Sequence, residues 1–314
     1  MQRVLSTAAL VGLLIATAAA FAITERLKLV KSPIYGTQVA NHGRFSPVCH
    51  CQTSRATIRI KLRHDDDVTA SILDGSRKAV RILAVGRPLP PGTAVFHWGG
   101  ASDTGGLAPD GVYHVQFHLA KAHRTILLPN RIVLDTTPPQ VESVQTGRAT
   151  FSPDGDGRAD VERIHYRFDS PAHAVLYLYG GKVLGPTWSH SASGTVAWHG
   201  KLDGKPLPQG TYVLWIGGID LAGNETPAAD RRPVIVRVRY IELTRKQIAA
   251  PAGTIAAVGV VTDASGYTWH IGKRSGFATN DVFRFRLPTK SGRYTLRVEE
   301  AGHTASAAVV AEKP

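Results

Sequence analysis

A glycine-rich loop carries three aspartates within seven residues. Its sequence is Asp154-Gly-Asp-Gly-Arg-Ala-Asp160, so carboxylates stand at Asp154, Asp156 and Asp160. Calcium is bound by about six to eight hard oxygens, and closely spaced aspartates in a tight turn supply several of them, together with backbone carbonyls such as that of Arg158. The loop lacks the helical flanks of an EF-hand. Two interpretations stay open: a calcium site that Glu162 or Asp203 could help to complete, and a solvated Asp/Gly turn.

The two cysteines of the chain, Cys49 and Cys51, are separated by a single residue. Three interpretations compete: a disulfide between them, a soft-metal site that includes His42 or His50, and two free thiols. Zinc takes about four ligands, and scattered histidines supply no recognisable set. Disulfides persist in oxidising compartments outside the cytoplasm. We therefore expect a Cys49–Cys51 disulfide.

The sequence offers little for catalysis. Its 13 histidines are scattered, and it contains no G-x-S-x-G or H-E-x-x-H motif and no glycine-rich phosphate loop leading into a helix. We therefore expect a protein that is not an enzyme. The alternative is an envelope enzyme, or an enzyme accessory, that acts on cell-wall polymer.

The chain is strongly basic. It has 37 Lys and Arg against 24 Asp and Glu, a formal net charge of +13, which favours anionic partners. The basic residues stand singly along predicted strands, as Arg284 and Arg286 do, rather than in a dense cluster, so nucleic acid is disfavoured. The partners that we expect are an anionic cell-wall polymer or another envelope protein.

The N-terminal 31 residues set the predicted compartment. Val4 to Ile23 contains no charged residue and would span about 30 Å as a helix, enough to cross a bilayer. Two Ala-x-Ala patterns near its end, Ala18–Ala20 and Ala20–Ala22, suit signal cleavage. We expect residues 1–31 to be a signal anchor that contacts the membrane, with single-pass topology and extracytoplasmic domains. The alternative is a cleaved signal peptide and a secreted protein.

The remainder contains an internal duplication. Phe45-Ser-Pro47 recurs as Phe151-Ser-Pro153, and the same offset of 106 aligns the alternating segments that follow. Two further landmarks recur in the same order: Trp98 corresponds to Trp198, and Tyr113 to Tyr212. Because these residues occupy equivalent repeat positions, we expect the two tryptophans to lie in cores rather than to form a sugar platform.

Each copy is predicted to be all-β. Apolar and polar residues alternate with period two over 56–62 and 161–168, as in half-buried strands, and turn sequences separate the short strands. The expected organisation is a tandem array of immunoglobulin-like β-sandwiches after an N-terminal hydrophobic helix: residues 32–139, a degenerate copy; 140–240; and 241–314, a smaller sandwich without the Phe-Ser-Pro and Trp-Gly landmarks. In the ungapped register Val48, His50 and Ser54 replace the three loop aspartates.

The second copy resembles the immunoglobulin-like domain of flagellar hook-capping proteins and other bacterial secreted proteins. The resemblance rests on four motifs in order over 148–238: Phe151-Ser-Pro-Asp-Gly-Asp-Gly157, Trp198-His-Gly200, Gly210-Thr-Tyr212 and Asp220-Leu-Ala-Gly-Asn224. The first copy matches more weakly over 43–135. The resemblance implies a non-catalytic sandwich outside a bacterial cell and names no ligand. We therefore expect a structural, adhesive or ligand-presenting envelope protein, with calcium stiffening its second domain.

Overall fold

The computed structural model describes residues 11–22, 31–148 and 150–313. It divides into two compact units, Met1–Thr136 and Thr137–Pro314. Residues 11–22 are helical, and the described residues contain no helix with the length and apolar character that crossing a membrane requires. The other parts of the predicted signal or anchor segment, residues 1–10 and 23–30, lie outside the described residues.

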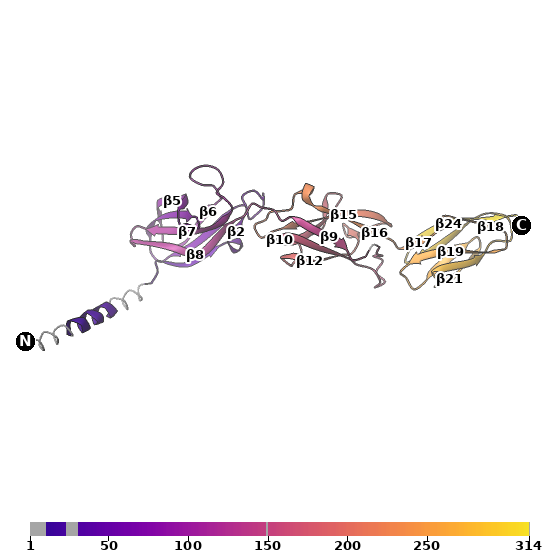
Figure 1. Cartoon of the computed structure of the whole chain (residues 1–314), viewed down its shortest axis with the longest axis horizontal. Helices are drawn as coiled ribbons and strands as arrows, with labels where there is room; N and C mark the ends of the chain where they lie inside the picture. Colours follow the sequence, from indigo (N-terminus) through magenta and orange to yellow (C-terminus); the bar gives the residue numbers. More distant parts are fainter. Residues whose placement is uncertain (1–10, 23–30, 149, 314) are drawn as a thin grey trace, which may run out of the picture. The chain divides into compact units, whose positions relative to one another are not determined.

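The first unit is a β-sandwich of two sheets (Figure 1). The three-stranded sheet has the order β1-β3-β6, and the five-stranded sheet has the order β2-β8-β7-β4-β5, with only the β2–β8 pair parallel. Its elements are β1 (Ile34–Val39), the 3-10 turn η1 (Asn41–Gly43), β2 (Arg44–Phe45), β3 (Ala56–Leu62), β4 (Asp66–Leu73), β5 (Ala79–Leu89), β6 (Gly92–Trp98), β7 (Gly111–Leu119) and β8 (Arg124–Leu134).

The second unit begins with a sandwich in which one long strand, β10, belongs to both sheets. Its first part pairs with β9 and β12, and its last part pairs with β11 and β15, which in turn pairs with β16. The elements are β9 (Val141–Thr146), β10 (Glu162–Leu178), β11 (Gly181–Leu184), β12 (Ser191–Trp198), β13 (Lys201–Leu202), β14 (Lys205–Pro206), β15 (Gly210–Ile219), the 3-10 turn η2 (Ala228–Asp230) and β16 (Arg232–Val238).

The second unit ends with a sandwich whose strand order repeats that of the first unit. Its sheets have the orders β17-β19-β22 and β18-β24-β23-β20-β21, with β18 parallel to β24. The strands are β17 (Ile241–Leu243), β18 (Gln247–Pro251), β19 (Ile255–Thr262), β20 (Tyr267–Ile271), β21 (Arg274–Ala278), β22 (Val282–Arg286), β23 (Gly292–Glu300) and β24 (His303–Glu312). An all-β chain of tandem immunoglobulin-like sandwiches is therefore confirmed.

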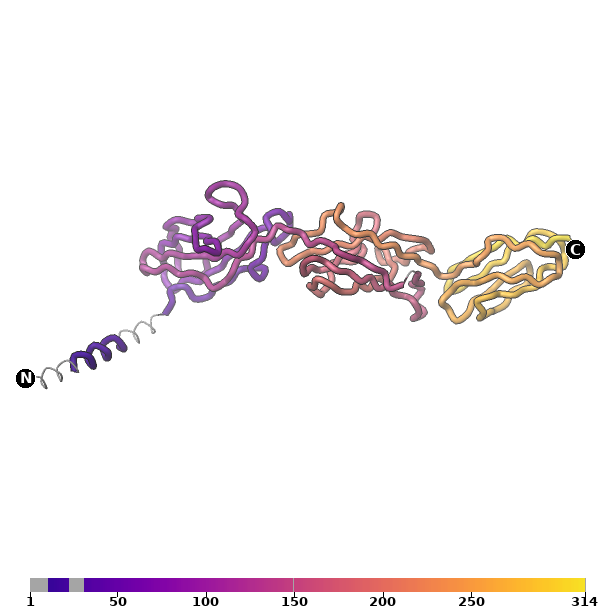
Figure 2. Tube along the Cα trace, in the orientation of Figure 1, coloured from indigo at the N-terminus to yellow at the C-terminus, as the bar shows by residue number. Residues whose placement is uncertain are grey.

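Period-two alternation accounts for the three cores. Along β3, Ile58, Ile60 and Leu62 are buried while their neighbours face outwards, because successive side chains of a strand point to opposite sides of its sheet. Separate apolar clusters fill the sandwiches over residues 34–134, 141–240 and 241–311. The chain passes from the second cluster at Tyr240 directly to the third at Ile241 (Figure 2).

The landmark residues of the duplication contact one another in both copies. The Phe45 and Trp98 rings pack with centroids 5.3 Å apart, and those of Phe151 and Trp198 with centroids 5.6 Å apart. The glycine two residues after Trp198 is required: Gly200 has φ +63, and a Cβ there would lie 2.7 Å from Pro153 and 3.1 Å from Phe151. The Phe-Ser-Pro and Trp-x-Gly motifs are thus two sides of one packing contact.

A tyrosine hydroxyl bonds the chain four residues upstream in all three sandwiches. Tyr113 donates to the Pro109 carbonyl at 2.5 Å, Tyr212 to that of Pro208 at 2.7 Å, and Tyr294 to that of Lys290 at 2.9 Å. This is the tyrosine corner of immunoglobulin-like sandwiches. Each of these tyrosines ends a Gly-x-Tyr sequence, so this landmark extends to the third sandwich.

Replacing Trp98 or Trp198 with alanine should destabilise its own sandwich by about 3–5 kcal/mol, because each ring is almost completely buried and its loss leaves a cavity. Urea unfolding, followed by hydrogen exchange of the sandwich concerned, measures the loss. Trp188 is fully exposed, so Trp188→Ala is the matched control and should change stability by less than about 0.5 kcal/mol. A loss below about 1 kcal/mol for either buried tryptophan would contradict the packing described here.

Candidate metal centre

The acidic loop is closed by its last aspartate. The two carboxylate oxygens of Asp160 accept hydrogen bonds from the backbone N–H groups of Gly155, at 2.6 Å, and Gly157, at 2.7 Å. Asp160 therefore turns inwards on its own loop. Asp154 and Asp156 each accept one backbone N–H as well, at 3.2 and 2.7 Å, which leaves further oxygen lone pairs on both for a ligand.

Asp154 and Asp156 meet a third aspartate that the loop sequence does not contain. One carboxylate oxygen from each of Asp154, Asp156 and Asp263 lies within 4.8 Å of the other two. Asp263 follows β19 in the third sandwich, in the turn that leads to β20. The cluster therefore combines two loops from neighbouring sandwiches of the second unit.

The contact between these sandwiches is fixed by a connection of two residues, Arg239 and Tyr240, between β16 and β17. The Tyr240 hydroxyl is buried and donates to the Leu207 carbonyl at 2.7 Å. On its other side the Tyr240 ring stacks on the imidazole of His303, with centroids 3.5 Å apart and planes 2° from parallel. His303 begins β24, so the turn between β23 and β24 is held beside the end of the second sandwich.

Glu300, the last residue of β23, belongs to the same acidic environment. Its cross-strand partner is His303. Burial, and then the negative charges of Asp154, Asp263 and Asp156, raise the pKa of Glu300 to about 7. Burial together with Asp154 and Asp156 also raises the pKa of Asp263. Both pKa shifts have the same two causes, desolvation by burial first and the crowding of like charges second.

Several of these carboxylate oxygens have no hydrogen-bond donor. Both side-chain oxygens of Asp263 and Oε2 of Glu300 each expose less than 1 Å² and are unpartnered. Ser152 is close enough to lower the pKa of Asp263, but its hydroxyl donates its one proton to Asp154, at 2.9 Å. A cavity of about 140 Å³ lies alongside, lined in part by Ser152, Arg239 and Asp263.

Arg158 contacts the cluster through two hydrogen bonds that involve backbone groups. The Arg158 guanidinium donates to the carbonyl oxygen of Asp263 at 3.2 Å, and the Arg158 N–H donates to Asp156. The Arg239 guanidinium pairs with Glu242 at 2.8 Å. Among the ion pairs between described residues, none neutralises Asp154, Asp156, Asp263 or Glu300.

The structure thus brings together two of the predicted ligands and groups one further aspartate, Asp263, with them. Asp154 and Asp156 lie in the cluster, Asp160 closes the loop, and Arg158 contacts Asp263. Glu162 lies in the core, where its Oε1 accepts the N–H groups of Gly147 and Arg148. Asp263 and Glu300 were missed because they lie in another sandwich and follow no ligand spacing. The repeat could not indicate them, since the first copy has no acidic loop.

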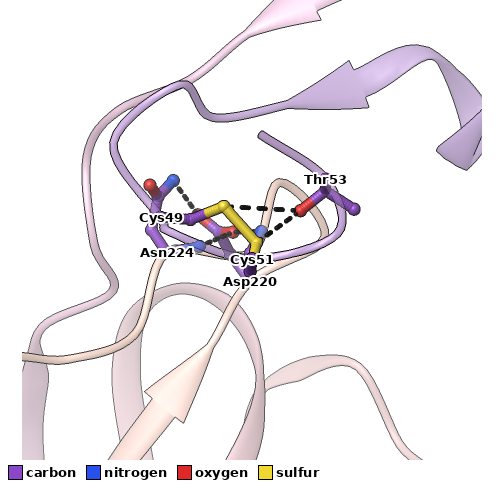
Figure 3. Close-up of a disulfide and its surroundings, with 6 residues drawn as sticks. Cys49, Cys51, Thr53, Asp220 and Asn224 are labelled. Atoms are coloured by element: carbon purple, nitrogen blue, oxygen red, sulfur yellow. Dashed lines mark hydrogen bonds between the residues drawn. A yellow bond between two sulfur atoms is a disulfide. The ribbon is translucent and has the colours of Figure 1, made fainter. Parts of the chain in front are cut away.

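In the first unit the equivalent loop is closed by a covalent bond. A disulfide joins Cys49 and Cys51, whose Cα atoms are 5.2 Å apart, and the Thr53 hydroxyl lies 2.9 Å from Cys51 Sγ (Figure 3). The Asp220 carboxylate accepts the Asn224 N–H and side-chain amide, at 2.9 and 2.8 Å, so the Asp-Leu-Ala-Gly-Asn motif is a closed turn.

Comparisons with known proteins give structural similarities only. No protein-family model matches the sequence, and no curated protein matches it. A titin I9–I11 tandem aligns with TM-score 0.32 and 8% identity, covering 89% of this chain and 100% of that chain. The D0–D1 domain of intimin aligns with TM-score 0.25 and 13% identity over 65% and 99%.

A third similarity is to a Bacteroides ovatus protein of a mixed-linkage glucan utilization locus, solved in complex with a mixed-linkage heptasaccharide. It aligns with TM-score 0.22 and 14% identity over 89% of this chain and 71% of that chain. At these TM-scores none of the similarities carries an argument about function.

Glu162 should make the stability of the second sandwich depend on pH. Burial raises its pKa, so the folded state holds this proton more tightly than the unfolded chain does. The free energy of unfolding should therefore fall as pH rises from about 4.3, the ordinary value for Glu, through the raised pKa. Glu162→Gln removes this titrating group. The stability of the variant relative to the parent should therefore increase as pH rises over the same range.

Urea unfolding of parent and variant at several pH values measures the difference. Glu142→Gln is the control, because Glu142 lies on the surface in a pair with Arg167 and should leave the slope unchanged. Parallel pH profiles for the parent and Glu162→Gln would contradict this assignment.

Proposed function

We propose that this chain is a non-catalytic, extracytoplasmic protein of the bacterial cell envelope, in which tandem β-sandwiches present a ligand-binding surface. The observation that carries the proposal is the repetition of one sandwich with the same strand order. Repeating such a module adds length and surface without adding reactive groups. The resemblance of residues 148–238 to the hook-capping type of domain supports the same role.

Two features support the location. The uncharged segment from Val4 to Ile23 suits a signal anchor or a cleaved signal peptide. The Cys49–Cys51 disulfide suits an oxidising compartment, where such bonds persist. Residues 32–314 then lie outside the cytoplasm, either tethered to the membrane through the N-terminal segment or secreted.

The surface best suited to a ligand is the open edge of the third sandwich. A cavity of about 620 Å³ lies there, lined in part by Trp269 of β20, Phe277 of β21, and Val282, Phe283 and Arg284 of β22. Phe277 is 66% exposed and Val282 51% exposed. Exposed apolar groups gathered in a concave place mark binding sites.

The chemistry of this edge favours an anionic cell-wall polysaccharide. Aromatic rings offer flat apolar surfaces on which the apolar face of a sugar ring can lie. Arg284 is exposed at the same place, and a guanidinium binds carboxylate or phosphate through paired hydrogen bonds. The net charge of +13 attracts such a polymer over a longer range.

The purified chain should retain fragments of anionic wall polymer in a pull-down and release them uncut. Phe277→Ala together with Arg284→Ala should weaken binding by about tenfold or more, since it removes one aromatic and one charged contact. Trp188→Ala is the matched control, an exposed aromatic in the second sandwich, and should bind as the parent does.

Shortened polymer products would instead support the alternative function, an envelope enzyme or enzyme accessory. If the polymer does not bind but a purified envelope protein is retained, the partner is a protein. Equal binding by the double variant and the parent would remove the third-sandwich edge from the proposal.

A further inference from the structure

We propose that one calcium ion binds where the second and third sandwiches meet, held by carboxylates from both: the clustered Asp154, Asp156 and Asp263, with the buried Oε2 of Glu300 beside them. This goes beyond the loop site that the sequence predicts, because half of the ligands come from the third sandwich and Asp160 has another task. Only the expected calcium affinity depends on the proposed extracytoplasmic location; the site itself does not depend on it.

The unpartnered oxygens point to a missing cation. The two carboxylate oxygens of Asp263 are buried without a donor, and Glu300 Oε2 is buried in the same way. A buried carboxylate without a hydrogen bond or a counter-charge is costly. Here several like charges add their mutual repulsion, and a divalent cation removes both costs together.

The spacing of the oxygens suits calcium. Ligand oxygens lie about 2.3–2.6 Å from Ca²⁺, so two on opposite sides of the ion stand about 4.8 Å apart. The oxygens of Asp154, Asp156 and Asp263 already lie within 4.8 Å of one another. Magnesium demands a near-ideal octahedral shell at about 2.0–2.1 Å and usually keeps several waters, so a site built mainly from protein carboxylates favours calcium. Zinc prefers nitrogen and sulfur ligands, which this cluster does not offer.

The remaining ligand positions can be filled locally. Calcium takes about six to eight oxygen ligands. Four carboxylates provide between four and eight, depending on how many of them bind the ion through both of their oxygens. The adjoining cavity of about 140 Å³ has room for water molecules, each of which occupies about 30 Å³. Asp160 keeps the loop closed through Gly155 and Gly157, so that Asp154 and Asp156 are presented together.

Bound calcium would cross-link the two sandwiches. Asp154 and Asp156 belong to the loop before β10, whereas Asp263 and Glu300 follow or end strands of the third sandwich. The ion therefore adds a second connection beside the covalent one through Arg239 and Tyr240. Sites in extracellular modules bind calcium with Kd of about 10⁻⁴–10⁻³ M, and we expect this range.

Thermal unfolding of the full chain, stripped of metal and titrated with calcium, tests the site. The melting temperature of the second unit should rise by about 5–10 °C at a hundredfold excess over Kd. Magnesium at equal concentration should give a smaller rise. Hydrogen exchange at residues 239–246 should slow when calcium is added, because the cross-link restrains the connection.

The variants Asp263→Asn and Glu300→Gln should each weaken calcium binding by about tenfold or more. Without calcium both should melt above the parent, because each removes a charge from a repelling cluster. Loss of a merely structural contact would lower the melting temperature instead. Calcium affinity from isothermal titration supplies the second readout.

Two matched controls separate this site from its alternatives. Glu299→Gln changes the neighbouring residue of β23, which pairs with Arg297 at the surface, and should leave the calcium response unchanged. Asp230→Asn changes an exposed aspartate of the turn η2 in the second sandwich and should retain binding. A calcium response that survives Asp263→Asn and Glu300→Gln would overturn the proposal, and so would no response in the parent.

Discussion

The structure of the second unit depends on one constraint, a connection of only two residues between two sandwiches. With Arg239 and Tyr240 alone between β16 and β17, the first strand of the third sandwich starts where the last strand of the second ends. The buried Tyr240 fixes this place through Leu207 on one side and His303 on the other. The acidic loop, the turn after β19 and the end of β23 consequently share one small volume, which creates the charge cluster.

The same loop position is used in two chemical ways. In the first sandwich a Cys49–Cys51 disulfide closes it, and in the second Asp160 does so by accepting two N–H groups. Non-covalent closure leaves Asp154 and Asp156 available at the contact with the third sandwich. Four crowded carboxylates without a counter-charge would oppose that contact. Under our proposal, a bound cation determines whether the loop repels or holds the neighbouring sandwich.

The sequence predicts the strands better than it predicts the site. Period-two alternation and the Phe45–Trp98 and Phe151–Trp198 landmarks indicate the sandwiches, because they reflect local pleating and one repeated packing contact. Asp263 and Glu300 could not be predicted as partners of the loop. Their proximity arises from the packing of two sandwiches, and nothing in their own neighbourhoods has a ligand spacing. Gly292-Arg-Tyr294 was the one signal that linked the third sandwich to the duplication, through its tyrosine corner.

The central claim is that a hard cation joins the second and third sandwiches, and the position of a bound ion tests it most directly. Terbium binds the same oxygen ligands as calcium and scatters anomalously, so crystals of the chain grown with it locate the ion. We predict one anomalous peak about 2.3–2.6 Å from oxygens of Asp154, Asp156, Asp263 and Glu300. A peak bounded by Asp154 and Asp160 alone, or no peak at this contact, would contradict the account.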